Sequence, residues 1–413
     1  MSASLNTAQG IRSADDAVFT PKLDARCPSC GHLGLEEFAR VENVPVHNSL
    51  VLADAQAARS FPRGDVAIAL CNRCGFITNT LFDPDKIHYY QEYEDQQSFS
   101  PTFNAFARAL ASDLIERYDL KAKTVLEVGC GKGDFLALMC ELGASSGVGI
   151  DPTALEGRLT GPGSDRIKLI SDLYSEKYAN YSGDFVCCRH TLEHIPNTAE
   201  FLRTIRRAIG DRLNTPVFLE VPDVLRVLKE CAYWDVYYEH CSYFTPGSLA
   251  RLFNQCGFEV VDVRLGFADQ YILLEARPSV QPSSRLPALA ESVEEVRAAA
   301  ASYGRTLTQT LARWRGWFAQ RKAAGERVAV WGSGSKCVSF LTTLGVGDFV
   351  DHVVDINPHR HGKFLLGLGL EIESPNSLAL SRPDHVVVMN PIYVDEIQGM
   401  LDEMRVPAKV IAV

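Results

Sequence analysis

The 413-residue sequence predicts an α/β protein whose central part is a doubly wound sheet. Strand-like and helix-like segments alternate between residues 123 and about 278, which is typical of this architecture. Two C-x-x-C pairs precede that part, and a second strand–glycine–helix–strand unit follows it. We therefore expect a small N-terminal metal-binding domain, the central sheet domain and a C-terminal Rossmann-like α/β domain.

The central elements follow from short apolar runs separated by helical spacing. The last two strands follow each other with no helix between them, which predicts an antiparallel hairpin at one end of the sheet. The predicted strands are 124–128, 147–150, 167–171, 185–189, 217–221, 258–265 and 271–276. The predicted helices are 98–118, 135–141, 201–209 and 246–254, with a connecting helix over about 289–324.

Composition along the chain sets the expected boundaries. The N-terminal residues lack the apolar region of a signal peptide. The proline- and serine-rich stretch 278–287 indicates a hinge. The predicted parts are a disordered lead-in (1–20), a zinc-binding domain (21–90), the central domain (91–280), a linker with the long helix (281–325) and the C-terminal α/β domain (326–413).

Bulk composition narrows the function. The net charge of −10 argues against a nucleic-acid partner, because phosphate binding needs a basic face. No run of about 18 apolar residues occurs, so no membrane span is expected. Most cysteines outside the two pairs lie in apolar contexts that are typical of buried thiols, and a reducing cytoplasm is expected.

The cysteine pairs predict one structural metal site. Cys27 and Cys30, like Cys71 and Cys74, are two residues apart, so both thiolates of a pair can point at one ion. A glycine follows each second cysteine and permits the tight turn of a zinc knuckle. The long separation of the pairs suggests that the segment between them is a small subdomain. Four cysteines leave no open position, so we expect structural Zn²⁺; a redox pair and free thiols are the alternatives.

A glycine-rich loop after the first central strand predicts the cofactor. Glu127 precedes a G-x-G-x-G run, and Asp151 ends the next strand, where a carboxylate can accept hydrogen bonds from a ribose diol. The acid before the loop suits a cationic ligand better than a pyrophosphate. This pattern resembles motif I of the class I S-adenosylmethionine methyltransferases; a nicotinamide domain or a degenerate fold is the alternative. The expected S-adenosylmethionine-binding residues are Glu127, Gly129, Gly131, Gly133, Asp151, Asp172 and His190.

Two further segments carry acid–base chemistry. His194 follows the strand 185–189, at the carboxyl edge where open α/β sheets bind ligands. The stretch 234–240 packs Asp235, Tyr237, Glu239 and His240 together, and a Glu beside a His can orient or tune a general base. A capping role for His194 and a purely structural cluster are the alternatives.

The ordered set of motifs resembles the three-domain nucleotide-sugar C-methyltransferases of deoxysugar pathways. The shared features are four N-terminal cysteines, a Y-x-E-H element at Tyr237–His240, and a C-terminal glycine turn with D-x-N-P at 355–358. The resemblance implies methyl transfer to a carbon beside a ketone. It implies His240 as the likeliest base, Tyr237 and Glu239 as groups that orient it or steady the enolate, and His194 and Tyr93 as further active-site residues.

The C-terminal glycine turn has two interpretations. Gly332, Gly334, Lys336 and Asn357 are candidate substrate-binding residues, because backbone N–H groups and a lysine can hold the diphosphate of a nucleotide sugar. A vestigial fold element is the other interpretation.

The chain also departs from the family pattern. It has G-C-G-K-G at 129–133 where the family often has S-N-D-G, and Tyr93-Glu94-Asp95 where the family has Y-x-Y. The stretch 44–49 between the cysteine pairs also differs from the family's usual sequence. A small-molecule acceptor is expected in any case. The competing hypotheses are another O-, N- or C-acceptor and a scaffold that binds S-adenosylmethionine without turnover.

Overall fold

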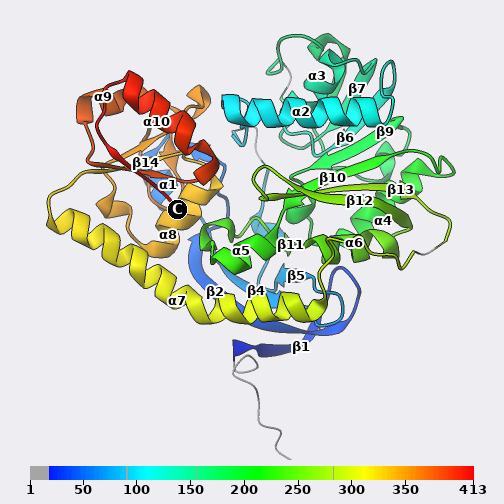
Figure 1. The fold of residues 1–413 in the computed structure, drawn as a ribbon, viewed down its shortest axis with the longest axis horizontal. Coiled ribbons are helices and arrows are strands. Elements are labelled where there is room, and N and C mark those ends of the chain that lie inside the picture. Colours follow the sequence, from blue (N-terminus) through cyan, green and yellow to red (C-terminus); the bar gives the residue numbers. More distant parts are fainter. Residues whose placement is uncertain (1–17, 90–91, 156, 282) are drawn as a thin grey trace, which may run out of the picture.

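The computed structural model describes residues 18–89, 92–155, 157–281 and 283–413, and its centre is a seven-stranded sheet (Figure 1). The strand order is β12-β13-β10-β9-β6-β7-β8, and β13 alone runs against its neighbours. The doubly wound sheet with a terminal antiparallel hairpin is therefore confirmed. The strands are β6 (Thr124–Val128), β7 (Ser146–Ile150), β8 (Ile167–Ile170), β9 (Phe185–Arg189), β10 (Val217–Pro222), β12 (Phe258–Gly266) and β13 (Tyr271–Pro278).

Helices cover both faces of this sheet. On one face α2 (Pro101–Arg117) and α3 (Asp134–Glu141) share an apolar cluster with β6 and β9. On the other face α4 (Thr198–Ile209) and α6 (Pro246–Gln255) pack their leucine and isoleucine side chains on the same strands. Because the strands are buried on both faces, they read as continuous apolar runs in the sequence.

The N-terminal unit is an antiparallel sheet that also takes a strand from the central unit. Its order is β1-β2-β4-β5-β11. The segment between the cysteine pairs is not a separate subdomain, because β2 and β4 are the two longest strands of this sheet. The bounds are β1 (Thr20–Arg26), β2 (Leu33–Pro45), β4 (Arg63–Leu70), β5 (Ile77–Asn79) and β11 (Ser242–Tyr243). Of the predicted lead-in, 1–17 lie outside the described residues and Thr20 already belongs to β1.

The C-terminal unit is a second parallel sheet in the order β17-β15-β14-β18-β19. Its strands are β14 (Val328–Trp331), β15 (His352–Val354), β17 (Ile372–Glu373), β18 (His385–Val388) and β19 (Lys409–Ala412). Its helices are α8 (Ser335–Leu344), α9 (Leu378–Ser381) and α10 (Val394–Glu403). One short pair, β3 (Val51–Leu52) with β16 (Phe364–Leu365), ties this unit to the N-terminal segment beside α1 (Ala55–Arg59).

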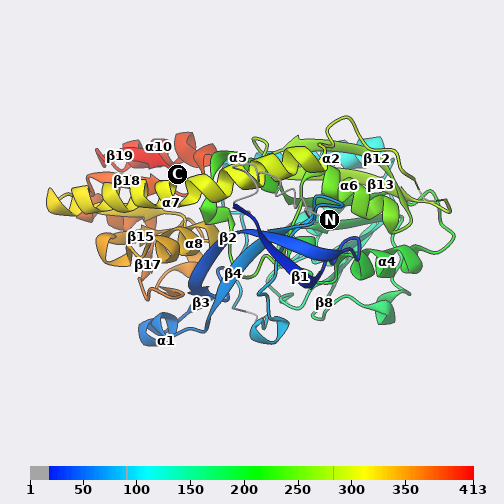
Figure 2. The same ribbon diagram turned by 90° about the horizontal axis from the view of Figure 1, so that it is seen from below.

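The predicted connecting helix is α7 (Val293–Ala323), and it runs past the N-terminal sheet to the C-terminal unit (Figures 1 and 2). Ser292 caps its first turn, and Glu295 completes a capping box, so it begins a few residues later than the apolar spacing suggests. Its buried side chains share one apolar cluster with β2, with α5 (Val224–Glu230) and with α8. A continuous core therefore joins the three units.

Candidate active site

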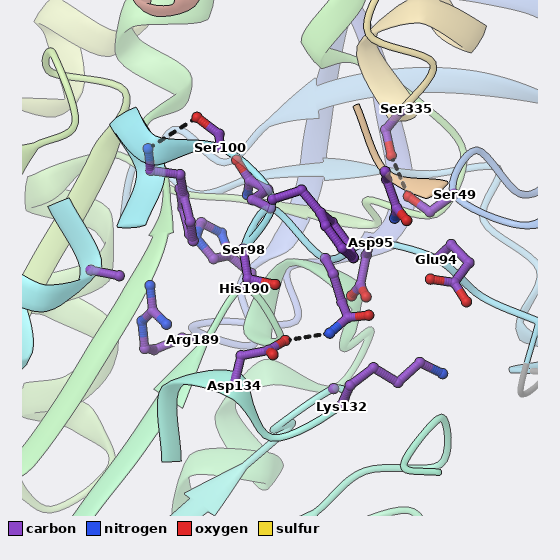
Figure 3. A pocket seen from close by; sticks show the side chains of 18 of the residues that line it. Ser49, Glu94, Asp95, Ser98, Ser100, Lys132, Asp134, Arg189, His190 and Ser335 are labelled. Atoms are coloured by element: carbon purple, nitrogen blue, oxygen red, sulfur yellow. Dashed lines mark hydrogen bonds between the residues drawn. The ribbon is translucent and has the colours of Figure 1, made fainter. Parts of the chain in front are cut away.

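A cavity of about 710 Å³ lies at the carboxyl edge of the central sheet, and all three units line it. The central unit contributes the glycine loop after β6, and the C-terminal unit contributes the turn before α8. Ser49 from the N-terminal segment and Ser335 at the start of α8 are hydrogen-bonded through their hydroxyls at 2.8 Å (Figure 3). Parts of the chain that are distant in sequence thus meet at the cavity.

The loop after β6 makes the tight turn that its glycines predict. Gly129 has a φ of 74°, and a Cβ there would lie 1.9 Å from the Thr191 hydroxyl oxygen. The Gly131 N–H donates to Asp151 Oδ2 at 2.9 Å, which fixes that carboxylate at the end of β7. Gly133 has a φ of 90° and precedes α3, but it lies outside the residues that line the cavity.

Two acids with raised pKa values line this end of the cavity. Glu127 is 2 % exposed, and among the described residues its Oε2 atom has no hydrogen-bond partner. Burial raises its pKa to about 8, assisted by Asp151 and Asp134. Asp95, which the sequence interpretation did not select, is accessible inside the cavity, and the surrounding protein together with Asp151 raises its pKa to about 6. Such a site favours a cation.

Two predicted cofactor residues lie in different surroundings. Asp172 is outside the cavity lining, and its carboxylate accepts hydrogen bonds from Lys177 and Tyr178. His190 does line the cavity, with an unusual φ of 48° at the end of β9. Burial lowers the pKa of its imidazole, but Glu220 at 2.8 Å and Glu193 outweigh that effect and raise the pKa to about 9. His190 is therefore positively charged near pH 7.

The predicted acid–base groups line the same cavity. The ring of His240 lies 4.1 Å from that of Tyr237 and 4.8 Å from that of His194, measured between centroids. All three residues line the cavity, as does Tyr93. Burial, together with His194, His190 and Lys336, holds the pKa of His240 well below its usual value. The imidazole is therefore neutral and able to accept a proton.

Glu239 follows Tyr238 and precedes His240 in the sequence, but its carboxylate contacts residues of the segment 47–93. Its carboxylate accepts hydrogen bonds from the Tyr93 hydroxyl at 2.6 Å and from the Asn48 N–H, and it lies 3.5 Å from His47 Nδ1. It is outside the cavity lining. Burial would raise its pKa, but hydrogen bonding and charge from His47 lower it. Glu239 therefore anchors the Tyr93 hydroxyl from outside the cavity that Tyr93 and His240 line.

The C-terminal turn also faces the cavity, but its lysine is already engaged. Lys336 Nζ lies 2.8 Å from the Asp235 carboxylate. Asp235 also lines the cavity, although the sequence analysis did not predict it as a ligand-binding residue. Gly332 and Gly334 line the cavity with Asn357. Within the described ranges the buried Asn357 Nδ2 atom has no partner, so a donor is available there.

The four N-terminal cysteines converge on one point behind β4. Cys27 Sγ lies 3.7 Å from Cys74 Sγ, and Cys30 Sγ lies 3.6 Å from Cys71 Sγ. A tetrahedral ion with metal–sulfur bonds of about 2.3 Å requires sulfur separations of about 3.8 Å, so the set fits zinc. The two turns also share a hydrogen-bond pattern, in which the following glycine N–H donates to the carbonyl of the first cysteine.

Comparisons with known proteins agree with this geometry. A family model described as a methyltransferase domain matches residues 103–263, the sheet that carries the glycine loop. A second model, a C-methyltransferase C-terminal domain, matches residues 281–410. The chain is an S-adenosylmethionine-dependent methyltransferase.

The individual proteins that resemble this methyltransferase share a low sequence identity with it. The methyltransferase is 28 % identical over 396 residues to the C-methyltransferase NovU of Streptomyces niveus, and the match covers 90 % of each chain. It is 28 % identical over 223 residues to a tRNA U34 carboxymethyltransferase of Helicobacter acinonychis, covering 50 % of this chain and 80 % of the relative. The solved structure of the dimethyltransferase RosA from Streptomyces davawensis aligns with a TM-score of 0.34 at 18 % identity, covering 43 % of this chain and 54 % of that one. Among the described helices of the methyltransferase, none is long and apolar enough to cross a membrane.

The affinity of the methyltransferase for S-adenosylmethionine is expected to rise from pH 5.5 to pH 7.5. The sulfonium cation favours the ionised forms of Asp95 and Glu127, whose pKa values are raised to about 6 and about 8. Below those values the protein must release protons to bind the cation, which costs affinity, and the cost disappears as the pH rises. Titration calorimetry at several pH values measures this. S-adenosylhomocysteine, which lacks the sulfonium charge, is the control and should show a flatter profile; equal slopes for both ligands would contradict the prediction.

Proposed function

We propose that this methyltransferase transfers a methyl group to a carbon atom beside a ketone, on a nucleotide-linked sugar, by way of an enolate. The observation that carries the proposal is that the neutral imidazole of His240 lies beside Tyr237 and His194, in the cavity that Tyr93 and the glycine loop also line. An O- or N-acceptor with a lone pair needs less assistance than a carbon acid. A weakly acidic C–H bond needs both a base and a group that stabilises the oxyanion.

The donor side follows from the residues around the glycine loop. Asp151 is placed to accept hydrogen bonds from a ribose diol, while Glu127 and Asp95 favour the cationic part of S-adenosylmethionine. S-adenosylmethionine supplies an electrophilic methyl group. The glycine loop holds it in position relative to the acceptor, and such positioning accounts for much of the acceleration in a displacement reaction.

On the acceptor side His240 removes the α-proton, and its electron pair moves into the enolate. Burial raises the pKa of Tyr237 well above its usual value, so this phenol keeps its proton and can donate a hydrogen bond to the enolate oxygen. The carbon then attacks the methyl group. In this scheme Glu239 acts by holding the Tyr93 hydroxyl in place.

The C-terminal turn supports a nucleotide-linked acceptor. Gly332, Gly334, Lys336 and Asn357 face the same cavity, and the start of α8 favours an anion. A diphosphate there would compete with Asp235 for Lys336. The relative NovU is itself a C-methyltransferase, and the match extends through this domain. For the N-terminal unit we propose a structural zinc ion held by the four cysteines.

A direct test uses a nucleoside-diphosphate-linked 4-keto-6-deoxyhexose with S-adenosylmethionine. We expect a product heavier by one methylene unit, with the new methyl on carbon in its NMR spectrum. In D₂O without methyl transfer, the α-hydrogen should exchange with solvent. The same sugar with its ketone reduced to an alcohol is the matched control and should neither exchange nor be methylated. Methylation of oxygen or nitrogen, or of the reduced sugar, would contradict the proposal.

A further inference from the structure

Glu193 is the carboxylate that faces the imidazole pair. It lies in the short turn Leu192–His194 after β9 and is 2 % exposed. One of its oxygens and one ring nitrogen each of His194 and His240 lie within 4.8 Å of one another. Over the part of the chain that the structure describes, the buried Oε2 atom of Glu193 has no hydrogen-bond partner. It lines the cavity, whereas Glu239 does not.

The other oxygen of Glu193 faces a positive charge. Its Oε1 atom lies 3.6 Å from His190 Nδ1, and His190 is also held by Glu220. Glu193 thus lies between a charged imidazole, His190, and the neutral imidazole of His240. The Cys241 thiol contacts its backbone carbonyl at 3.7 Å, which links the turn to the segment that follows His240.

When His240 removes a proton it becomes a positively charged imidazolium, and Glu193 is placed to balance that charge. His240 is 6 % exposed, so the imidazolium it becomes is poorly solvated. Asp235 lines a small pocket together with His240 and Glu193, but its carboxylate is already paired with Lys336 and Arg226. The remaining groups near His240 are imidazoles, an ammonium and phenols. These groups are His190, His194, Lys336, Tyr237 and Tyr243.

We propose that Glu193 is a positioning residue that acts as the counter-ion of protonated His240. The role rests on the proposed removal of an α-proton. The proton moves from carbon to the His240 ring nitrogen, its bonding pair becomes the enolate, and the imidazolium returns the proton to solvent after methyl transfer. Glu193 stabilises the cation and orients the ring, as the carboxylate of a catalytic triad does.

Glu193→Gln keeps the shape of the side chain and removes its charge. We expect α-hydrogen exchange of the keto sugar in D₂O, measured with S-adenosylhomocysteine in the donor site, to slow by about 100-fold. Methyl transfer should slow by a similar factor, with KM for both substrates within about 3-fold of the wild type. The acid limb of the kcat profile should move to lower pH, because the imidazolium has lost its counter-ion and His240 becomes a weaker base.

Two variants separate this role from a structural one. Glu193→Asp retains the charge and should recover part of the exchange rate, and Glu200→Gln, on the exposed surface of α4, should match the wild type. Exchange in Glu193→Gln at the wild-type rate with an unmoved pH profile would overturn the role of Glu193 alone. A second tightly bound divalent ion per chain, lost with Glu193→Gln, would also overturn it. No exchange by the wild type would overturn the proposed function, and the role of Glu193 with it.

Discussion

Replacing His240 with alanine is expected to lower kcat by about 10³-fold while leaving the affinity for S-adenosylmethionine unchanged. The imidazole of His240 is neutral, buried and part of the cavity lining. Its loss therefore removes the base and leaves the glycine loop at 129–133 unchanged. General-base catalysis contributes about 10²–10⁴-fold in enzymes, and little water reaches the buried position of this ring. Steady-state kinetics and calorimetric binding of the donor measure the two effects.

The control for this variant is His359→Ala, which removes an exposed histidine outside the cavity lining and should retain activity. Added imidazole should restore part of the His240→Ala rate if the lost group is a base. A fully active His240→Ala protein would remove His240 from the mechanism. A protein that had lost donor binding as well would show that the residue supports the fold of the cavity.

Replacing Cys71 with serine is expected to abolish zinc binding and to lower Tm by more than 10 °C. Structural zinc sites contribute about 10–16 kcal/mol of apparent binding free energy in small zinc domains, and that energy stabilises the folded state. Cys71 is fully buried at the end of β4. Since β5 pairs with β11, which begins two residues after His240, loss of the ion should also reduce catalysis. Metal analysis and calorimetry measure the content and Tm.

Wild-type protein should hold one zinc ion per chain. Cys256→Ser is the matched control, because this buried thiol donates to the Ala199 carbonyl at 3.4 Å and a serine hydroxyl can do the same. It should keep the ion and lose little stability. Wild-type protein that holds no zinc as purified, or whose Tm does not fall when its zinc is removed, would contradict a structural zinc site.

Most of the fold could be predicted because its signals are local. The strands of the central sheet are apolar runs between glycines and helix caps, and 185–189 matches β9 residue for residue. The pairing of β11 with β5 could not be predicted, since a two-residue strand carries no periodicity. The same holds for β3 and β16, which meet over about 310 positions of sequence.

The site divides along the same line. The glycine loop, Asp151 and His240 follow from residue types at fixed spacing, and the structure brings them to one cavity. The contacts of Glu239 could not be predicted, because the side chains of adjacent residues can point in different directions. Its carboxylate is hydrogen-bonded to Asn48 and Tyr93. Asp95 and Glu193 gave no motif of their own. A buried acid is recognised only once the surrounding atoms show what it faces.

The segment 233–243 has consequences for engineering. The Ser339 hydroxyl of α8 holds the Val236 carbonyl at 2.8 Å, and the Thr78 hydroxyl of the N-terminal sheet holds the Cys241 carbonyl at 2.7 Å. The segment that carries His240 is therefore held by hydrogen bonds from both the N-terminal and the C-terminal unit. Chimaeras that exchange the C-terminal lobe to change the acceptor would also displace the group that reacts with it. Grafts should carry α8 and this segment together as one cassette.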